Sequence, residues 1–165
     1  MPLSLAIGEL LGYTSGERDK WEQWFQAQPA GAVDAPVQRE GRFLDVWALM
    51  DHIFLVERRH TQRLRQLLPL AEQTGVARPD TAALFQFGRD ARHDFEDFLR
   101  TAPQQDLTRT IEVKFGREMR FTARKLAFHI LIHEVRHWAQ IALALRCAGF
   151  APPGEHDLIF ASAME

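Results

Sequence analysis

The sequence predicts an all-α fold, a four-helix bundle with a short β-hairpin before the last helix. Four long segments carry apolar residues three to four positions apart, the spacing of amphipathic helices. The stretch RTIEVKFGREMRFTA instead alternates apolar and polar residues around a glycine, which is typical of a hairpin. With 165 residues, 46% of them hydrophobic and 25% charged, the chain is expected to form one domain over residues 1–165.

The first three helices are bounded by loops rich in proline, glycine and polar residues. We expect the first from about Leu3 to Gln28 and the second from about Phe43 to Leu68. The third should start after Asp80, whose carboxylate can cap the helix, and end near Ala102, before Pro103.

The hairpin and the last helix follow directly on one another. Gly116 can turn the chain between two alternating apolar sets, which are Ile111, Val113 and Phe115 before it and Met119 and Phe121 after it. The last helix should begin near Thr122, a second capping candidate, and stop at Gly149, a residue suited to a helix C-terminus.

Charge and composition exclude several classes of protein. The net charge is −2 and there is no block of Lys or Arg, so no nucleic-acid partner is expected. Apolar runs are interrupted before membrane-spanning length and no signal-peptide pattern opens the chain, so no membrane partner is expected either. Cys147 is the only cysteine, which excludes an intrachain disulfide. These features predict a cytoplasmic protein.

The last predicted helix places three histidines four residues apart in an otherwise apolar segment. His133 and His137 are separated by about 40° around the helix and about 6 Å along it, so both rings can bind one ion. His129 is about 12 Å from His137 along the axis, too far to share that ion, and is interpreted as a structural histidine or one beside the site. His52, in the inward apolar stripe of the second helix, is the candidate third ligand. A hydrogen-bonded histidine cluster without metal is the alternative.

The other histidines suggest no site. His60 and His93 lie in polar helical stretches, VERRHTQR and RDARHDFED, and are interpreted as solvated surface residues. His156 lies in the Pro- and Gly-rich tail and is interpreted as a loop residue that could fold back over a site.

Residues 133–137 also spell H-E-x-x-H, the motif of zinc peptidases, with Glu134 as the general base. One known continuation of that motif needs Gly and His where this chain has Gln140 and Leu143. Another needs a glutamate on a following helix, and the nearby Glu155 sits after prolines that prevent a helix. The peptidase interpretation is therefore disfavoured. Glu134 is left either as an acid–base residue or, more simply, as the partner of an arginine.

With VWALMDHIFLVE around His52 and the segment HILIHEVRHWAQIALALRCAGFAPP, the chain resembles the DinB-like family of bacterial metal-binding helical bundles, named for DNA-damage inducibility. The resemblance covers most of the chain. It implies that His52, His133 and His137 bind a divalent metal ion. Where that family usually has Arg-Gly-Gln after the last histidine, this chain has Trp-Ala-Gln at 138–140.

The resemblance also implies a metal-dependent S-transferase or isomerase that uses a low-molecular-weight thiol such as bacillithiol, mycothiol or glutathione. We therefore expect a divalent-metal-dependent enzyme, a thiol-dependent S-transferase acting on a small electrophile. The expected cofactor is Zn or Ni ahead of Fe or Mn, with the thiol as co-substrate. Gln140 and Glu134 are the candidate catalytic residues. Gln140 would orient a ligand or the substrate, and Glu134 would contribute acid–base chemistry. A non-catalytic metal-binding stress protein and an HExxH-type metal hydrolase are the alternatives.

A homodimer is expected because the last helix is apolar around most of its circumference. Three short neighbouring helices would not easily cover such a helix. The first helix adds a further set of large apolar residues: Leu3, Ile7, Leu10, Leu11, Trp21, Trp24 and Phe25.

Overall fold

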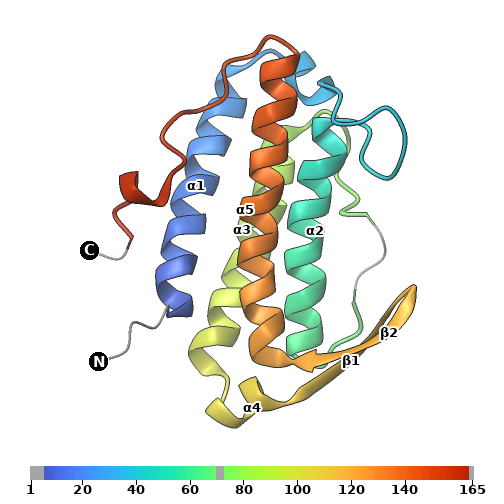
Figure 1. The fold of residues 1–165 in the computed structure, drawn as a ribbon, viewed down its shortest axis with the longest axis vertical. Helices are drawn as coiled ribbons and strands as arrows, with labels where there is room; N and C mark the ends of the chain where they lie inside the picture. Colours follow the sequence, from blue (N-terminus) through green and yellow to red (C-terminus); the bar gives the residue numbers. More distant parts are fainter. Residues whose placement is uncertain (1–5, 70–72, 164–165) are drawn as a thin grey trace.

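The computed structural model describes residues 6–69 and 73–163, and four long helices form its bundle (Figure 1). These helices are α1 (Ile7–Ala27), α2 (Val46–Leu64), α3 (Thr81–Thr101) and α5 (Ala123–Cys147). In Figure 1, α1 and α5 run upward while α2 and α3 both run downward, so a long connection must carry the chain back between α2 and α3. The predicted all-α bundle with a hairpin before the last helix is confirmed.

The helix boundaries were predicted to within a few residues where capping residues mark them. Asp80 accepts a hydrogen bond from the Ala83 N–H at 2.9 Å, and Thr122 accepts one from the Lys125 N–H at 3.1 Å. Gly149 has a φ of +87°, the left-handed conformation that ends a helix at low cost for glycine.

The second helix is shorter than predicted, since it begins at Val46 rather than Phe43. Asp45 accepts from the Ala48 N–H at 2.9 Å and so caps it, which leaves Phe43 in the preceding loop. The helix ends at Leu64 rather than Leu68. The predicted start of the first helix at Leu3 lies outside the described residues. Three short helical segments were not predicted: Ala30–Asp34, α4 (Gln104–Thr108) and Leu158–Phe160.

The hairpin pairs β1 (Thr110–Phe115) with β2 (Arg117–Thr122) in antiparallel register, Thr110 opposite Thr122. Gly116 turns the chain with a φ of +70°. Ile111 is buried against the base of the bundle, whereas the tip of the hairpin extends beside α2 (Figure 1). Because β2 leads directly into α5, the hairpin is held close to the seam between α2 and α5.

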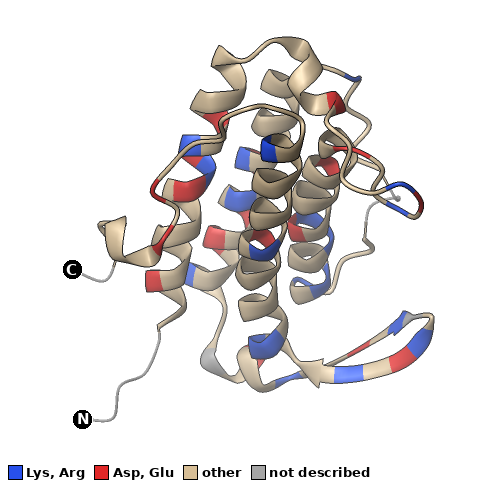
Figure 2. Ribbon diagram, turned by 45° about the horizontal axis from the view of Figure 1, so that its top comes forward, with Lys and Arg blue, Asp and Glu red and all other residues tan. Residues whose placement is uncertain are grey.

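The core consists of two apolar clusters separated by a layer of buried charge. One cluster contains Trp21, Phe54, Phe85 and Trp138, and the other contains Leu64, Phe95, Leu126 and Ile130. Charged positions of both signs occur along all four long helices (Figure 2). Between the clusters, each helix contributes one buried charged residue: Arg18, Glu57, Arg92 and Glu134. None of the helices in the described residues has the length and apolar character needed to cross a membrane.

Candidate metal centre

The seam between α2 and α5 brings the three predicted ligands together. The Nε2 atom of His133 lies 3.1 Å from Nε2 of His52 and 3.0 Å from Nε2 of His137. One ligand atom from each ring lies within 4.8 Å of the others. Helical periodicity explains this arrangement, because residues four apart on α5 share one face and that face meets the inward stripe of α2.

This donor set fits a divalent cation. Imidazole nitrogens bind zinc at about 2.0–2.1 Å in tetrahedral geometry, which places the nitrogens roughly 3.3 Å apart. The observed separations of 3.0 and 3.1 Å are within a few tenths of that value. Without a cation the three atoms cannot all be satisfied, since the single Nε2 of His133 faces two other ring nitrogens and can donate at most one hydrogen.

Gln140 holds the ring of one candidate ligand in a defined orientation. Its Oε1 lies 2.5 Å from Nδ1 of His137. A carbonyl oxygen only accepts, so Nδ1–H of His137 donates and the Nε2 lone pair is directed toward the other two histidines. The sequence suggested that Gln140 orients a ligand or the substrate. That role stays a prediction, and this hydrogen bond supports it because partners of this kind orient metal ligands in proteins.

All three histidines are held in the neutral form that binds metal. Burial lowers the pKa of His52 to about 3, with repulsion from His137 and Arg42 adding to the effect. Burial, followed by repulsion from His137 and His52, lowers the pKa of His133 to about 2. The pKa of His137 is also lowered, by burial first, although Gln140 partly opposes the shift. Neutral imidazole keeps its lone pair available, so the cluster is ready for a cation at neutral pH.

An aromatic residue that was not predicted covers the cluster. The ring of Phe43 lies 4.4 Å from the ring of His52 and 6.0 Å from that of His137. Phe43 was expected inside a helix, yet it belongs to the loop before α2. Its loop position leaves no periodicity in the sequence that could have indicated this contact.

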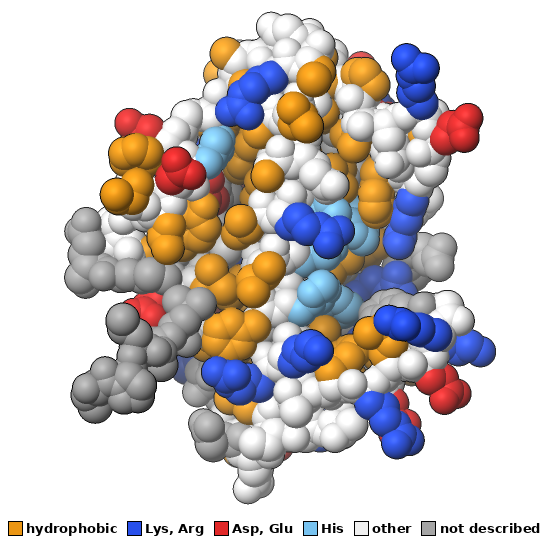
Figure 3. Space-filling model, viewed as in Figure 1, with side chains coloured by type: hydrophobic (Ala, Val, Ile, Leu, Met, Phe, Trp, Pro, Cys, Tyr) orange, Lys and Arg blue, Asp and Glu red, His pale blue; other side chains and the backbone are white. Residues whose placement is uncertain are grey.

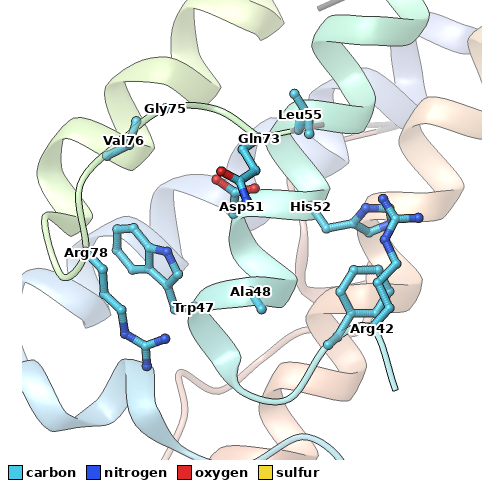
Figure 4. Close-up of a pocket in the computed structure, with 11 residues that line it drawn as sticks. Arg42, Trp47, Ala48, Asp51, His52, Leu55, Gln73, Gly75, Val76 and Arg78 are labelled. Carbon is cyan, nitrogen blue, oxygen red and sulfur yellow. The ribbon is translucent and has the colours of Figure 1, made fainter. Parts of the chain in front are cut away.

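Two cavities give access to the histidines. The first, of about 610 Å³, has His52 and Arg42 at one end and Trp47 and Arg78 at the other (Figure 4). The second, of about 570 Å³, is lined by both His52 and His133 and extends toward the hairpin. Histidine side chains are visible in the middle of the face shown in Figure 3, with Lys and Arg around them and Asp and Glu toward its margins. A small molecule can therefore reach the histidines from the surface.

His129 and His60 extend the row of histidines, and the prediction for His60 was wrong. The ring of His129, on the exposed side of α5, lies 5.3 Å from that of His133 and 5.5 Å from that of His60. His60 is only 5% exposed, not a solvated surface residue, because α5 and the hairpin lie over its side of α2. Burial, followed by the charge of Arg63, lowers the pKa of His60 to about 3.

The remaining two histidines lie away from the cluster. His93 is exposed on α3, as predicted. His156 is a loop residue, as predicted, and its Nδ1 lies 2.5 Å from a carboxylate oxygen of Glu17. Its ring stacks on Trp21 at 5.2 Å, so the tail folds back on α1 and not over the three ligands.

Glu134 has a partner other than the histidines. Its carboxylate accepts from Arg18 at 2.8 and 2.9 Å, from Arg92, and from the Trp138 indole N–H at 3.0 Å. Burial acts to raise the pKa of Glu134, but Arg18 and Arg92 hold it below its ordinary value. The simpler of the two interpretations, an arginine partner, is thus the one that the geometry describes.

Known proteins resemble this chain in fold over nearly its whole length. YfiT from Bacillus subtilis, described as "a probable metal-dependent hydrolase with an unusual four-helix bundle topology", superimposes with a TM-score of 0.70 at 15% identity, over 92% of this chain and 94% of YfiT. The DinB-like protein YjoA from Bacillus subtilis superimposes with a TM-score of 0.60 at 13% identity, over 92% of this chain and 96% of YjoA. No curated protein matches the sequence. The model of the DinB family matches residues 1–163, and the chain therefore belongs to the DinB family.

Proposed function

We propose that this protein is a metal-dependent enzyme that transfers a small thiol to a small electrophile. His52, His133 and His137 would hold one divalent ion, zinc or nickel ahead of iron or manganese. The observation that carries the proposal is the convergence of three imidazole Nε2 atoms at the meeting point of two open cavities, with no carboxylate among them.

The donor set determines the chemistry. An ion held by three neutral imidazoles keeps its full +2 charge and an open position, and it lowers the pKa of a thiol or water that reaches it. Gln140 keeps the His137 ring in its metal-binding tautomer, and Phe43 excludes water from one side of His52. In the transfer, the thiol sulfur bonds to the electrophilic carbon, the leaving group departs with its electron pair, and the thiol proton passes to water.

Hydrolysis by an activated water is the second candidate. It is supported by the description of YfiT, which has the same fold, as a probable metal-dependent hydrolase. The peptidase form of this idea needs Glu134 as a base beside the metal, and the two arginines that bind its carboxylate argue against that role. A metal-binding protein without catalysis is the third possibility, and it shares the same ligand set.

Cobalt(II) substitution tests the proposal. Cobalt-loaded protein should develop a sulfur-to-metal absorption band when a small thiol is added, increasingly so as the pH approaches the thiol pKa, about 8.5 for a cysteine-like group. Glu134→Gln should keep this response, provided that circular dichroism shows it folded, whereas His137→Ala should lose it. No band with glutathione, cysteine or cysteamine would reject the thiol as co-substrate and leave the activated water as the better proposal.

We also propose that the protein is a cytoplasmic homodimer. On α5, Ile132 and Leu143 are 55% and 62% exposed, and both lie on the outward side of the helix. This exposed apolar stripe supports a two-fold helical interface. Light scattering at micromolar concentration should give twice the monomer mass for the wild type and the monomer mass for Ile132→Glu. A monomeric wild type would reject the dimer.

A further inference from the structure

The cavity that leads from the metal centre toward the hairpin is lined by cations. Arg42, Arg59, Arg63 and Lys114 all contribute to it, together with His52, His60, His129 and His133. No Asp or Glu lines this cavity in the described part of the chain. Positive charge therefore accumulates in a cavity of about 570 Å³ that ends at two of the three candidate ligands.

Arginines on the other side of α2 are neutralised. Arg58 is paired with Asp94, and Arg65 with Asp97 at 2.6 Å, both partners lying on α3. Arg59 is next to Arg58 in sequence but faces the cavity instead, and no carboxylate among the described residues pairs with it. Its Nε atom is buried and has no hydrogen-bond partner in the described residues. A buried donor of a charged group that lacks a partner is costly, so Arg59 indicates that a ligand completes the site.

The other cations add to the positive charge around the same cavity. Lys114, an exposed residue of β1, lies opposite Glu118 in the hairpin and also contributes to the lining of the cavity. Arg63 lies one helical turn after Arg59 on the same face of α2, and burial followed by the charge of Arg59 lowers its pKa. Two guanidinium groups one turn apart can bind a carboxylate or phosphate through paired charge-assisted hydrogen bonds.

We propose that this cavity binds an anionic group, a carboxylate or a phosphate, of the small molecule that reacts at the metal centre. That the bound molecule reacts at the metal centre rests on the proposed function. The binding of the anion does not, since the anion site itself needs no metal. Arg59 lies seven residues after His52 on α2, so its Cα is about 10 Å further along the helix axis, while its side chain leans back toward His52. A ligand with its reactive atom at the histidines and its anionic group at Arg59 is thus about the size of a small peptide-like thiol.

Calorimetric titration of the metal-free protein tests the anion site by itself. Inorganic phosphate and glutarate serve as probes, and the tighter of the two indicates the kind of anionic group. Arg59→Gln should weaken binding about ten-fold or more, and Arg59→Lys by less because it keeps the charge. Lys114→Gln, on the exposed hairpin, should weaken binding several-fold without endangering the fold. Arg58→Gln is the matched control on the other side of α2 and should leave binding unchanged.

A comparison of two thiols tests whether the anion site helps to bind the thiol that reaches the metal centre. With cobalt-loaded protein, glutathione, which carries two carboxylates, should give the absorption band at a concentration about ten-fold or more below that needed for cysteamine, which carries none. Arg59→Gln should abolish this preference. Equal responses to both thiols, no binding of either anion by the wild type, or unchanged anion binding in Arg59→Gln would overturn the anion site. Anion binding with no band from either thiol would instead reject the thiol transfer and leave the anion site intact.

Discussion

Nδ1 of His137 donates to Oε1 of Gln140 at 2.5 Å, and this hydrogen bond directs the opposite nitrogen of the ring toward His133. The two residues lie three positions apart on α5, so the helix itself sets their separation. Gln140 is exposed, and its side chain makes no other hydrogen bond in the described residues. Its contact with His137 is therefore the main feature that a substitution would remove.

Gln140→Ala should lower metal affinity about 10–100-fold, the usual effect of removing a hydrogen-bonded partner of a ligand. The His137 ring would lose its fixed tautomer and orientation, while the three nitrogens would all remain. Competition with a chromophoric chelator measures the change. Gln86→Ala, at an exposed position on α3, is the control and should leave affinity unchanged. Equal affinities in the wild type and Gln140→Ala would show that the hydrogen bond has no part in metal binding.

Each of the three substitutions His52→Ala, His133→Ala and His137→Ala should remove most of the bound metal. Each removes one of the three donors that converge in the described part of the chain, and two imidazoles leave the ion weakly held. Elemental analysis of gently purified variants gives the metal content per chain. His93→Ala, on the exposed face of α3, and His60→Ala should both keep the metal. Full retention by His52→Ala would reject His52 as the third ligand and make His129 the next candidate.

The convergence of these histidines was predictable because it depends on helical periodicity. A spacing of four places His133 and His137 on one face whatever surrounds the helix, and the apolar neighbours of His52 show which side of α2 turns inward. The capping residues Asp80 and Thr122 likewise act within a few residues of themselves. Features of this kind are encoded locally, so the sequence alone suffices to find them.

The features that were missed depend on contacts between distant segments. His60 has polar neighbours in sequence, and only the placement of α5 and the hairpin over it makes it a buried residue. Phe43 covers His52 from a loop, where no periodicity applies. The charged layer needs one residue from each of four helices, and any one of them considered alone resembles a solvent-facing Arg or Glu.

The burial of His60 should make the stability of the metal-free protein depend on pH. The pKa of His60 is about 3 in the folded protein and 6.5 in the unfolded chain, so below pH 6.5 the unfolded chain binds a proton that the folded one does not. The free energy of unfolding should therefore fall as the pH is lowered from 6.5 toward 3, by up to about 1.4 kcal/mol per pH unit from this residue. At pH 5 the loss amounts to about 2 kcal/mol.

Urea denaturation of metal-free protein at pH 8, 6.5 and 5 measures this dependence. His60→Gln removes the titrating group, so its stability should fall less between pH 6.5 and 5 than that of the wild type, even if it is less stable at pH 8. His93→Gln, which changes an exposed histidine, should follow the wild-type slope. Parallel slopes for His60→Gln and the wild type would contradict a neutral, buried His60.

The buried charged layer gives the last prediction, because it separates stability from metal binding. Glu134 is 2% exposed and interacts with both Arg18 and Arg92, so Glu134→Gln leaves two buried guanidinium groups with one carboxylate, that of Glu57. Removing one partner from such a group costs about 3–5 kcal/mol of folding free energy. Asp94→Asn, which breaks the partly exposed pair with Arg58, should cost no more than about 1 kcal/mol. The same Glu134→Gln protein, folded at low temperature, should hold as much metal per chain as the wild type. If it were instead stable but depleted of metal, Glu134 would act at the metal centre rather than in the charged layer, and the peptidase interpretation would gain support.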